Sequence, residues 1–440
     1  MPLLLFFLGI VRKIVLRDWG PEAWRIPIQA FVKLLLLIML FIGAVLLLVA
    51  ALAMLPLIVA VIGVVLVVVS FTWLISFFAP HLLATAPSNP IPMPTTTPTS
   101  PPPLDVIVDP GLNPNAEYDA VFEGGGVKAI AHIGALKRLE DAGLKPRHVA
   151  GTSGGAVIGG AVVAGGKAVD IWGILTDGDL TRVLDARTAP NRPLLRHPLY
   201  ALTPLIPGLL LDKSMFRGLA LREFLRESLA GLVGGPPDPT FKDLPGFPDQ
   251  KVHLIAADIT RRVTVDFPSG DTAADYEKWP DPELMPVADA VYMSAAIPFF
   301  FAPKRLLIKD TTVEADLVDG GVTSGFPIWV FDVPCDPEIP TFGFLLEEGK
   351  AAPSPIRNVL SFAWNLIQTG IGSADKILSE HNETRTIEIP IPPGITSTDF
   401  DLSQAQQVAL FVSGYEAADS FLQSFVWSDY VLKYRCKAAP

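Results

Sequence analysis

Three short stretches of this sequence hold residues whose types and spacing could carry out a reaction. The stretch GTSGG at residues 151–155 fits the pattern GxSxG and lies between a strand-like and a helix-like run. In that setting the serine occupies a strained turn with its hydroxyl exposed, and flanking glycines leave room for backbone and substrate. Ser153 is therefore a candidate nucleophile, with Gly151 and Gly155 as the glycines of the turn, although a serine here could instead cap the helix.

The second stretch is EGGGVKAIAHIGAL at residues 123–136, where three glycines follow an apolar run and open into a helical pattern. The bare backbone of Gly124, Gly125 and Gly126 would present N–H groups at the positive end of a helix. Beside the serine turn, such donors could form an oxyanion hole. Lys128 could orient this loop, meet a lipid phosphate or simply be solvated.

The same glycines also fit a dinucleotide fingerprint, GxGxxA, through Gly124, Gly126 and Ala129. That fingerprint requires an acidic residue about 20 positions on, at the end of a second strand. The sequence offers Asp141 at the end of the helix instead. The fingerprint would also leave the serine turn unexplained, so we favour the oxyanion hole and expect no cofactor.

The third stretch is VDGG at residues 318–321, where Asp319 ends a strand and enters a glycine turn. Its carboxylate could accept the serine proton if burial raised its pKa toward neutrality, or it could cap its own turn. The alternative is a triad, because Ser153, Asp319 and His381 follow the chain order of α/β-hydrolases. His381 could equally be an ordinary polar residue at a helix end.

Two neighbouring βα units would position the serine and the glycines. We expect a strand at residues 118–123 and a helix at 128–142, then a strand ending at Ala150 and a helix from Gly154. Two such units predict a mainly parallel sheet covered by helices. Further strands are expected at 251–260 and 261–267, and further helices at 220–232 and 361–381.

The amino-terminal part has the composition of a membrane segment. Residues 34–104 contain no Asp, Glu, Lys or Arg, and residues 34–79 are almost purely apolar. A bilayer core needs about 20 helical residues, so this run predicts a transmembrane hairpin within residues 34–80, with spans at 34–55 and 57–78. One long tilted helix or a buried helix is the alternative.

The flanking composition orients this hairpin. Residues 1–33 carry five basic and two acidic residues, which predicts a basic interfacial segment on the cytoplasmic side. Residues 81–104 form a Pro/Thr-rich linker, or alternatively a glycosylated stalk, before a globular domain at 105–440. Because a hairpin returns the chain to its starting side, we expect a multi-pass membrane protein with a cytoplasmic catalytic domain; a single crossing would place that domain outside.

Charge and cysteine content exclude other classes. The net charge is −11 and no basic patch stands out, so nucleic acid is not an expected partner. Cys335 and Cys436 cannot form a disulfide framework or a four-ligand zinc site, and no HExxH helix is present. We therefore expect no metal.

The stretches EGGGVKAIAHIGAL, GTSGGA and VDGG, in that order, resemble the motifs of the patatin-like phospholipases. Shorter phrases similar to the family are AADIT, SAAIPFFFAP, FDLS and SGYEAADSFL, so the resemblance covers residues 118–422. It implies a three-layer α/β/α sandwich with a mainly parallel central sheet. The chain departs from the family pattern at Ala129, where glycine is usual, and at Gly325, where asparagine is common.

The resemblance also implies an activity. Ser153 and Asp319 would form a Ser–Asp dyad, and residues 124–126 would supply the oxyanion donors. Such a site would release a fatty acid from a phospholipid, lysophospholipid or acylglycerol through an acyl-serine, with membrane lipids as its partners. A membrane-anchored lipid-binding protein without turnover belongs to a different class and remains the alternative.

Overall fold

The computed structural model describes Met39 and residues 116–176, 180–185, 213–332, 337–347 and 382–434. The chain divides into two compact units, Met1–Ala84 with Pro193–Thr203, and Thr85–Arg192 with Pro204–Pro440. Apart from Met39, every described residue belongs to the second unit.

Several sequence predictions lie outside the described residues. They are the basic segment 1–33, both predicted spans, the linker 81–104, the helix at 361–381, His381, Cys335 and Cys436. Within the described ranges, no helix has the length and apolar character needed to span a bilayer.

The second unit is built around an eight-stranded sheet with the order β10-β9-β1-β2-β4-β8-β7, in which β5 also pairs with β4. The strands are β1 (Glu117–Phe122), β2 (Lys145–Thr152), β4 (Val252–Asp258), β5 (Val263–Pro268), β7 (Lys304–Leu307), β8 (Glu314–Asp319), β9 (Thr341–Glu347) and β10 (Thr386–Pro390). The pairings from β10 to β4 are parallel, whereas β4–β5, β4–β8 and β8–β7 are antiparallel. The prediction of a mainly parallel sheet is confirmed. A separate two-stranded parallel sheet joins β3 (Ser214–Phe216) to β6 (Phe299–Phe301).

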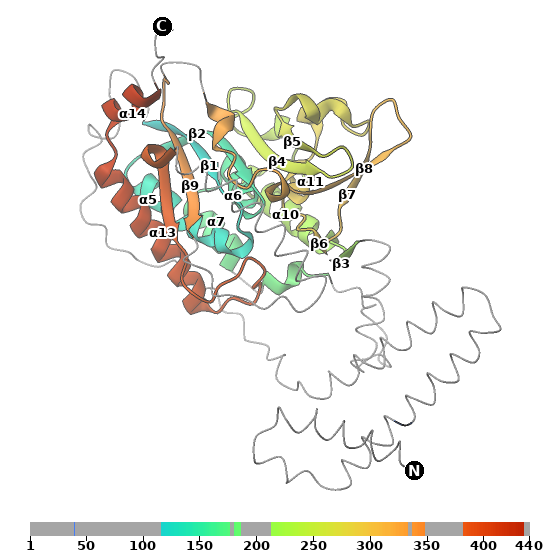
Figure 1. Cartoon of the computed structure of the whole chain (residues 1–440), viewed down its shortest axis with the longest axis horizontal. Coiled ribbons are helices and arrows are strands. Elements are labelled where there is room, and N and C mark those ends of the chain that lie inside the picture. Colours follow the sequence, from blue (N-terminus) through green and yellow to red (C-terminus); the bar gives the residue numbers. More distant parts are fainter. Residues whose placement is uncertain are drawn as a thin grey trace, which may run out of the picture. The chain divides into compact units, whose positions relative to one another are not determined.

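Helices connect and cover these strands (Figure 1). The α-helices are α5 (Ile130–Asp141), α6 (Gly154–Val163), α7 (Ala168–Thr176), α10 (Leu219–Val233), α11 (Val287–Ser294), α13 (Gln404–Ser424) and α14 (Trp427–Tyr434). The short 3-10 helices are η2 (Gly126–Ala129), η3 (Leu180–Val183), η5 (Phe241–Asp243), η6 (Asp271–Asp275), η7 (Pro282–Leu284), η8 (Gly320–Val322), η9 (Ile328–Phe331) and η10 (Glu383–Arg385). The helix predicted from residue 128 thus begins with the 3-10 turn η2.

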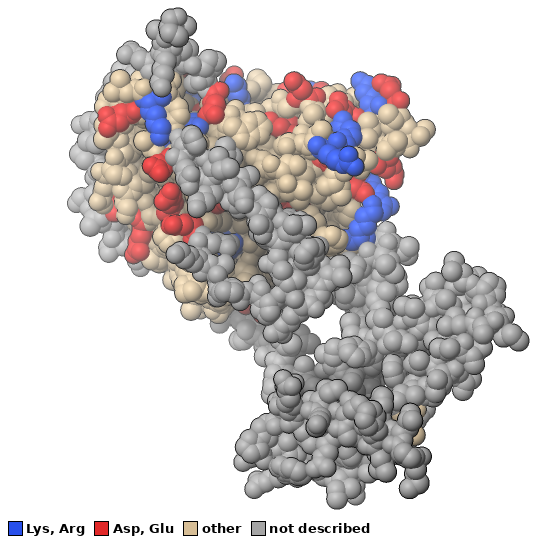
Figure 2. Space-filling view, in the orientation of Figure 1, with Lys and Arg blue, Asp and Glu red and all other residues tan. Residues whose placement is uncertain are grey.

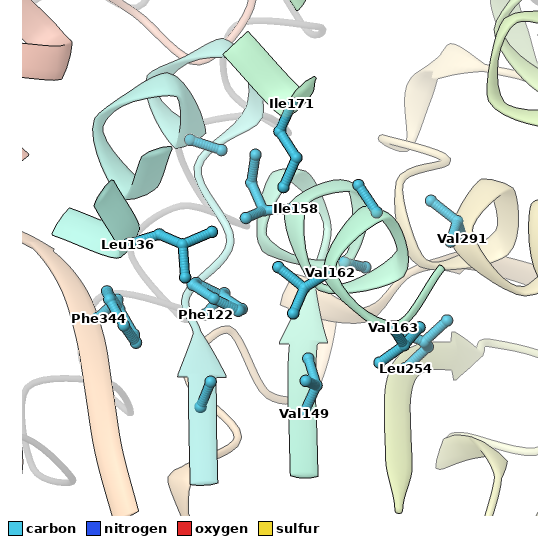
Figure 3. Packing of buried hydrophobic residues seen from close by; sticks show 14 of the residues in the cluster. Phe122, Leu136, Val149, Ile158, Val162, Val163, Ile171, Leu254, Val291 and Phe344 are labelled. Atoms are coloured by element: carbon cyan, nitrogen blue, oxygen red, sulfur yellow. The ribbon is translucent and has the colours of Figure 1, made fainter. Parts of the chain in front are cut away.

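Alternate side chains of β1 enter two different hydrophobic cores. Ala120 and Phe122 join a large core with the α-helices, whereas Val121 packs in a small core with Phe326 and Phe331. Figure 3 shows the large core, where side chains of α5 and α6 meet those of β1, β2, β4 and β9. In the described ranges the small core is covered by residues 326–331 and not by an α-helix, so the three-layer arrangement stays a prediction.

Pairing with β4 brings the ends of β2 and β8 together. Thr152, the last residue of β2, pairs with Ile255, and Asp319, the last residue of β8, pairs with Ala256. Because β2 is parallel to β4 and β8 is antiparallel, the two strands reach the same part of β4 from opposite directions. Ser153 and Asp319, 166 residues apart in the sequence, therefore come into contact.

The surface drawn in Figure 2 carries charges of both signs. Lys and Arg side chains lie interspersed with Asp and Glu side chains across the described part of that face. Salt bridges such as Lys213–Asp316 and Arg305–Asp316 pair opposite charges near β7 and β8.

Candidate active site

Ser153 lies on a sharp turn between β2 and α6. Its backbone has φ 55° and ψ −124°, and its side chain is buried, with 6% of the residue exposed. Positive φ in a residue other than glycine is sparsely populated and costs about 1–3 kcal/mol. The turn therefore has the strained geometry expected of a nucleophile elbow.

The glycines around Ser153 allow backbone segments to pack directly against one another. A Cβ on Gly151 would lie 2.5 Å from the carbonyl oxygen of Gly155. A Cβ on Gly155 would lie 2.3 Å from the carbonyl oxygen of Phe122, at the end of β1. Glycine is needed at both positions because any larger residue would push the elbow away from its neighbours.

The Ser153 hydroxyl meets the carboxyl group of Asp319. Ser153 Oγ donates to Asp319 Oδ2 at 2.5 Å, and the Gly321 N–H donates to Oδ1 at 2.8 Å. Only 5% of Asp319 is exposed. Burial raises the pKa of Asp319 to about 6, against the lowering effect of the two hydrogen bonds. A carboxyl group with this pKa is mostly ionised at pH 7. It is also a stronger base than an ordinary aspartate, so it can accept a proton from the serine more readily.

No imidazole separates this serine from this carboxylate. Their direct contact leaves no space for a ring between Oγ and Oδ2. His132 lies buried in α5, and its Nε2 is 2.9 Å from the carbonyl oxygen of Glu123. Burial lowers the pKa of His132 to about 4, as expected for a packed, neutral side chain.

The glycine loop after β1 lies against the serine elbow. A Cβ on Gly124 would lie 3.1 Å from Ser153 Cβ, and a Cβ on Gly154 would lie 2.3 Å from the carbonyl oxygen of Gly126. The two turns are therefore in backbone contact, as the neighbouring positions of β1 and β2 require.

The three glycines of the loop differ in their hydrogen bonds. The Gly124 N–H donates to the carbonyl oxygen of Gly325 at 2.9 Å, and the role of Gly124 as an oxyanion donor stays a prediction. The N–H groups of Gly125 and Gly126 donate to no other described residue. These two donors remain available to a ligand. Gly325, where the family commonly has asparagine, thus holds the loop through its main chain.

An apolar pocket opens beside Ser153. It encloses about 630 Å³ of empty space, part of it open to solvent. Its walls come from η2, α6, α7, η3, α10 and β6, with side chains such as Ile158, Leu225, Phe301 and Phe400. The Ser153 hydroxyl is the polar side-chain group of this lining. A pocket of this kind suits an aliphatic chain whose polar end lies at the serine.

A known protein family and a curated protein resemble this chain in sequence. The family model of the patatin-like phospholipases matches residues 120–332, which include Ser153 and Asp319. The uncharacterized protein YqhO of Bacillus subtilis is 32% identical over 314 residues, which make up 70% of this chain and 99% of that protein. The chain belongs to the patatin-like phospholipase family. This membership makes it an enzyme of the lipid acyl hydrolase class.

Other similarities to this patatin-like phospholipase are partial. Lysophospholipase nte1 of Emericella nidulans is 45% identical over 53 residues, which are 12% of this chain and only 4% of that protein. The structure of VipD from Legionella pneumophila has a TM-score of 0.42 and 17% identity, covering 72% of this chain and 71% of that one. ExoU from Pseudomonas aeruginosa has a TM-score of 0.34 and 17% identity, covering 70% of this chain and 53% of that one.

Lys128 of the patatin-like domain is buried, with 4% of the residue exposed, and it does not line the pocket. The prediction that Lys128 is solvated is therefore wrong. A contact with a lipid phosphate stays a prediction. In the described part of the chain, no group of three or more His, Cys, Asp or Glu side chains could hold a metal ion.

Sequence reasoning missed two groups that touch the site. The Ser153 N–H donates to Ser294 Oγ at 3.0 Å, and the Asp319 N–H donates to the carbonyl oxygen of Ala296 at 2.9 Å. Both belong to the stretch SAAIPFFFAP, whose likeness to the family assigns no role to either residue. Their partners are far away in the sequence, so no local pattern could assign them a role.

Proposed function

We propose that this chain hydrolyses the acyl ester of a lipid, with Ser153 as the nucleophile and Asp319 as its base. The observation that carries the proposal is the 2.5 Å hydrogen bond between Ser153 Oγ and Asp319 Oδ2. It lies beside a pocket whose apolar lining suits an acyl chain. Membership in the patatin-like phospholipase family supports the same reaction class.

The first half of the reaction forms an acyl-serine. The ionised Asp319 accepts the hydroxyl proton of Ser153 while Oγ attacks the ester carbonyl carbon. The resulting oxyanion accepts hydrogen bonds from the N–H groups of Gly125 and Gly126. When the tetrahedral intermediate collapses, the ester C–O bond breaks and the alcohol leaves with the proton held by Asp319.

The second half releases the fatty acid. Water gives a proton to Asp319 and attacks the acyl carbon, again with the developing oxyanion held by the glycine loop. The bond between the acyl carbon and Oγ then breaks, and Ser153 recovers its proton from Asp319. The same two side chains thus serve both steps, and no cofactor enters the proposed reaction.

The pocket supports a lipid as the substrate. Each methylene group that leaves water for an apolar environment contributes about 0.8 kcal/mol. Because the lining side chains near Ser153 are apolar, this binding favours long acyl chains over short ones. Phospholipids, lysophospholipids and acylglycerols all present such an ester at a membrane surface.

The amino-terminal composition supports a membrane location for this activity. We propose that residues 34–80 anchor the chain by two helices and that the catalytic domain faces the cytoplasm. The supporting observations are the uncharged run of residues 34–104 and the basic excess in residues 1–33. In sealed vesicles of known orientation, protease should cleave the carboxyl-terminal domain only from the cytoplasmic face. Cleavage from the opposite face would contradict the hairpin.

Fatty acid release tests the proposed reaction. Purified full-length protein is incubated with mixed vesicles of phospholipid and acylglycerol and with lysophospholipid micelles, and free fatty acid is measured. We expect release by the wild type and a loss of at least about 1,000-fold in Ser153→Ala, because this substitution removes the hydroxyl that takes the acyl group in the proposed reaction. A folded wild type that releases no fatty acid from any of these lipids would instead favour a binding protein without turnover.

A further inference from the structure

The segment 294–297, which begins at the last residue of α11, contacts both members of the proposed dyad. We infer that Ser294 is a positioning residue that holds the main chain of Ser153 in its reactive conformation. This inference rests on the proposed function, because it assigns Ser294 a role in the rate of that reaction. Ser294 does not touch the hydroxyl that reacts; it acts through the backbone of Ser153.

The hydroxyl of Ser294 makes two hydrogen bonds in a fully buried position. Its oxygen accepts the Ser153 N–H at 3.0 Å, and its proton is donated to the carbonyl oxygen of Ile255 at 2.5 Å. A hydroxyl can accept and donate at once, which a methyl group cannot do. Ser294 therefore ties the elbow to β4, the strand between β2 and β8.

This connection matters because the backbone of Ser153 is strained. A residue with φ 55° and ψ −124° keeps that conformation only when its surroundings enforce it. Loss of the Ser294 hydroxyl would free the N–H of Ser153 and leave it buried without an acceptor. The turn could then relax, and Oγ would move relative to Asp319. A misplacement of about 1 Å can cost about 100-fold in rate.

The same short segment also fixes the base and part of the pocket. The carbonyl oxygen of Ala296 accepts the Asp319 N–H, while Ala295 and Ile297 line the pocket. Ser294 thus begins a four-residue segment that contacts the nucleophile, the base and the proposed acyl site. This arrangement gives a physical role to the sequence SAAI, which the reaction steps alone leave unexplained.

Substitution of the hydroxyl tests the inference. We expect Ser294→Ala to lower kcat for lysophospholipid hydrolysis by about 10- to 100-fold, with KM changed less than about threefold. Labelling of Ser153 by a fluorophosphonate should slow by a similar factor. Ser294→Thr keeps the hydroxyl and should recover most of kcat, whereas Ser294→Cys, with a weaker hydrogen-bonding group, should lie between Thr and Ala.

Thr386→Val is the matched control. Thr386 is a buried residue on β10 whose hydroxyl donates to the carbonyl oxygen of Asn382 at 2.9 Å, away from the catalytic pair. Its loss also removes one buried hydroxyl-to-carbonyl bond. We expect a lower melting temperature with kcat within about twofold of the wild type, because β9 and β1 separate β10 from β2 in the sheet.

The outcomes distinguish a failure of this inference from a failure of the proposed function. If Ser294→Ala keeps wild-type kcat while Ser153→Ala is inactive, the role of Ser294 is wrong and the proposed function stands. If Ser294→Thr is as slow as Ser294→Ala, or if Thr386→Val loses kcat equally, the hydroxyl has no specific role and the inference fails. If the alanine variant does not fold, the threonine and cysteine variants decide by the same order of rates. If Ser153→Ala hydrolyses lipid like the wild type, both proposals fail together.

Discussion

The two glycine-rich turns of this protein look alike in sequence but use their glycines differently. In the turn after β1, a glycine itself takes the unusual conformation: Gly126 has φ 57°, and a Cβ there would lie 2.0 Å from the carbonyl oxygen of Ser397. In the turn after β2, the positive φ falls on Ser153, and the neighbouring glycines provide space. The first turn exposes main-chain donors, and the second exposes a side-chain hydroxyl.

This difference separates two uses of glycine. One is conformational, because only glycine adopts positive φ without a steric cost. The other is steric: a residue without a Cβ atom leaves clearance, that is, room for another backbone segment to approach closely. In this chain both uses are needed within a few ångströms, since the elbow and the loop touch between Gly154 and Gly126.

Among the glycine substitutions, the largest effect is expected from Gly155→Ala. The new Cβ would lie 2.3 Å from the carbonyl oxygen of Phe122 and 2.5 Å from that of Glu123, both in the backbone that leads into the glycine loop. Both turns must therefore shift. We expect activity to fall by at least about 100-fold and the free energy of unfolding by about 1–3 kcal/mol. Lipid hydrolysis and urea unfolding measure the two effects, and a fully active variant would show that clearance is not required there.

Gly126→Ala should have a strong but more local effect. It combines positive φ with a clash against the Ser397 carbonyl, so the loop must change and the proposed oxyanion donors move. We expect about a 100-fold loss of kcat.

Gly125→Ala is the matched control for this substitution. Its Cβ would lie 2.3 Å from the Cδ1 atom of Leu346, which is the flexible end of a side chain, and 3.7 Å from the next nearest atoms, and its N–H is kept. We expect kcat to fall less than about tenfold. Equal losses in the two variants would refute the distinction between the glycines of this loop.

A pH dependence, which needs no substitution, originates at Asp319 beside the elbow. Asp319 must be ionised to act as a base, so kcat should rise with pH through about 6 and be roughly tenfold lower at pH 5 than at pH 7. The contribution of Asp319 to the free energy of unfolding changes with pH in the opposite direction, because it falls as the pH rises. Because burial raises the folded-state pKa above the ordinary 3.8, this contribution is fully present below pH 3.8 and is lost as pH rises through about 6.

Asp319→Asn isolates both pH effects from those of other groups. The difference in unfolding free energy between wild type and variant, followed by urea unfolding from pH 4 to 7, should change only across this window. The variant should also lose the acidic limb of the rate profile along with most of its activity. A rate profile of the wild type that is flat from pH 5 to 7 would contradict Asp319 as the base.

The sequence predicted local features well and missed those that depend on long-range pairing. The two βα units, the turn at Ser153 and the strand ending at Asp319 follow from glycine spacing and apolar periodicity. The engagement of the Gly124 N–H by Gly325 and the contact of Ser294 with Ser153 do not, because they depend on how segments 141 or more residues apart align. The antiparallel approach of β8 to β4 belongs to the same class, since a strand pattern does not encode its direction.

Labelling with a fluorophosphonate lipid analogue, followed by mass spectrometry of the modified peptide, tests the central claim most directly. This reagent reports an activated serine independently of the lipid class that the enzyme prefers. The account predicts a covalent adduct on Ser153, its absence in Ser153→Ala and much slower labelling in Asp319→Asn. A folded wild type that is not labelled, or an adduct on a different residue that persists in Ser153→Ala, would contradict it.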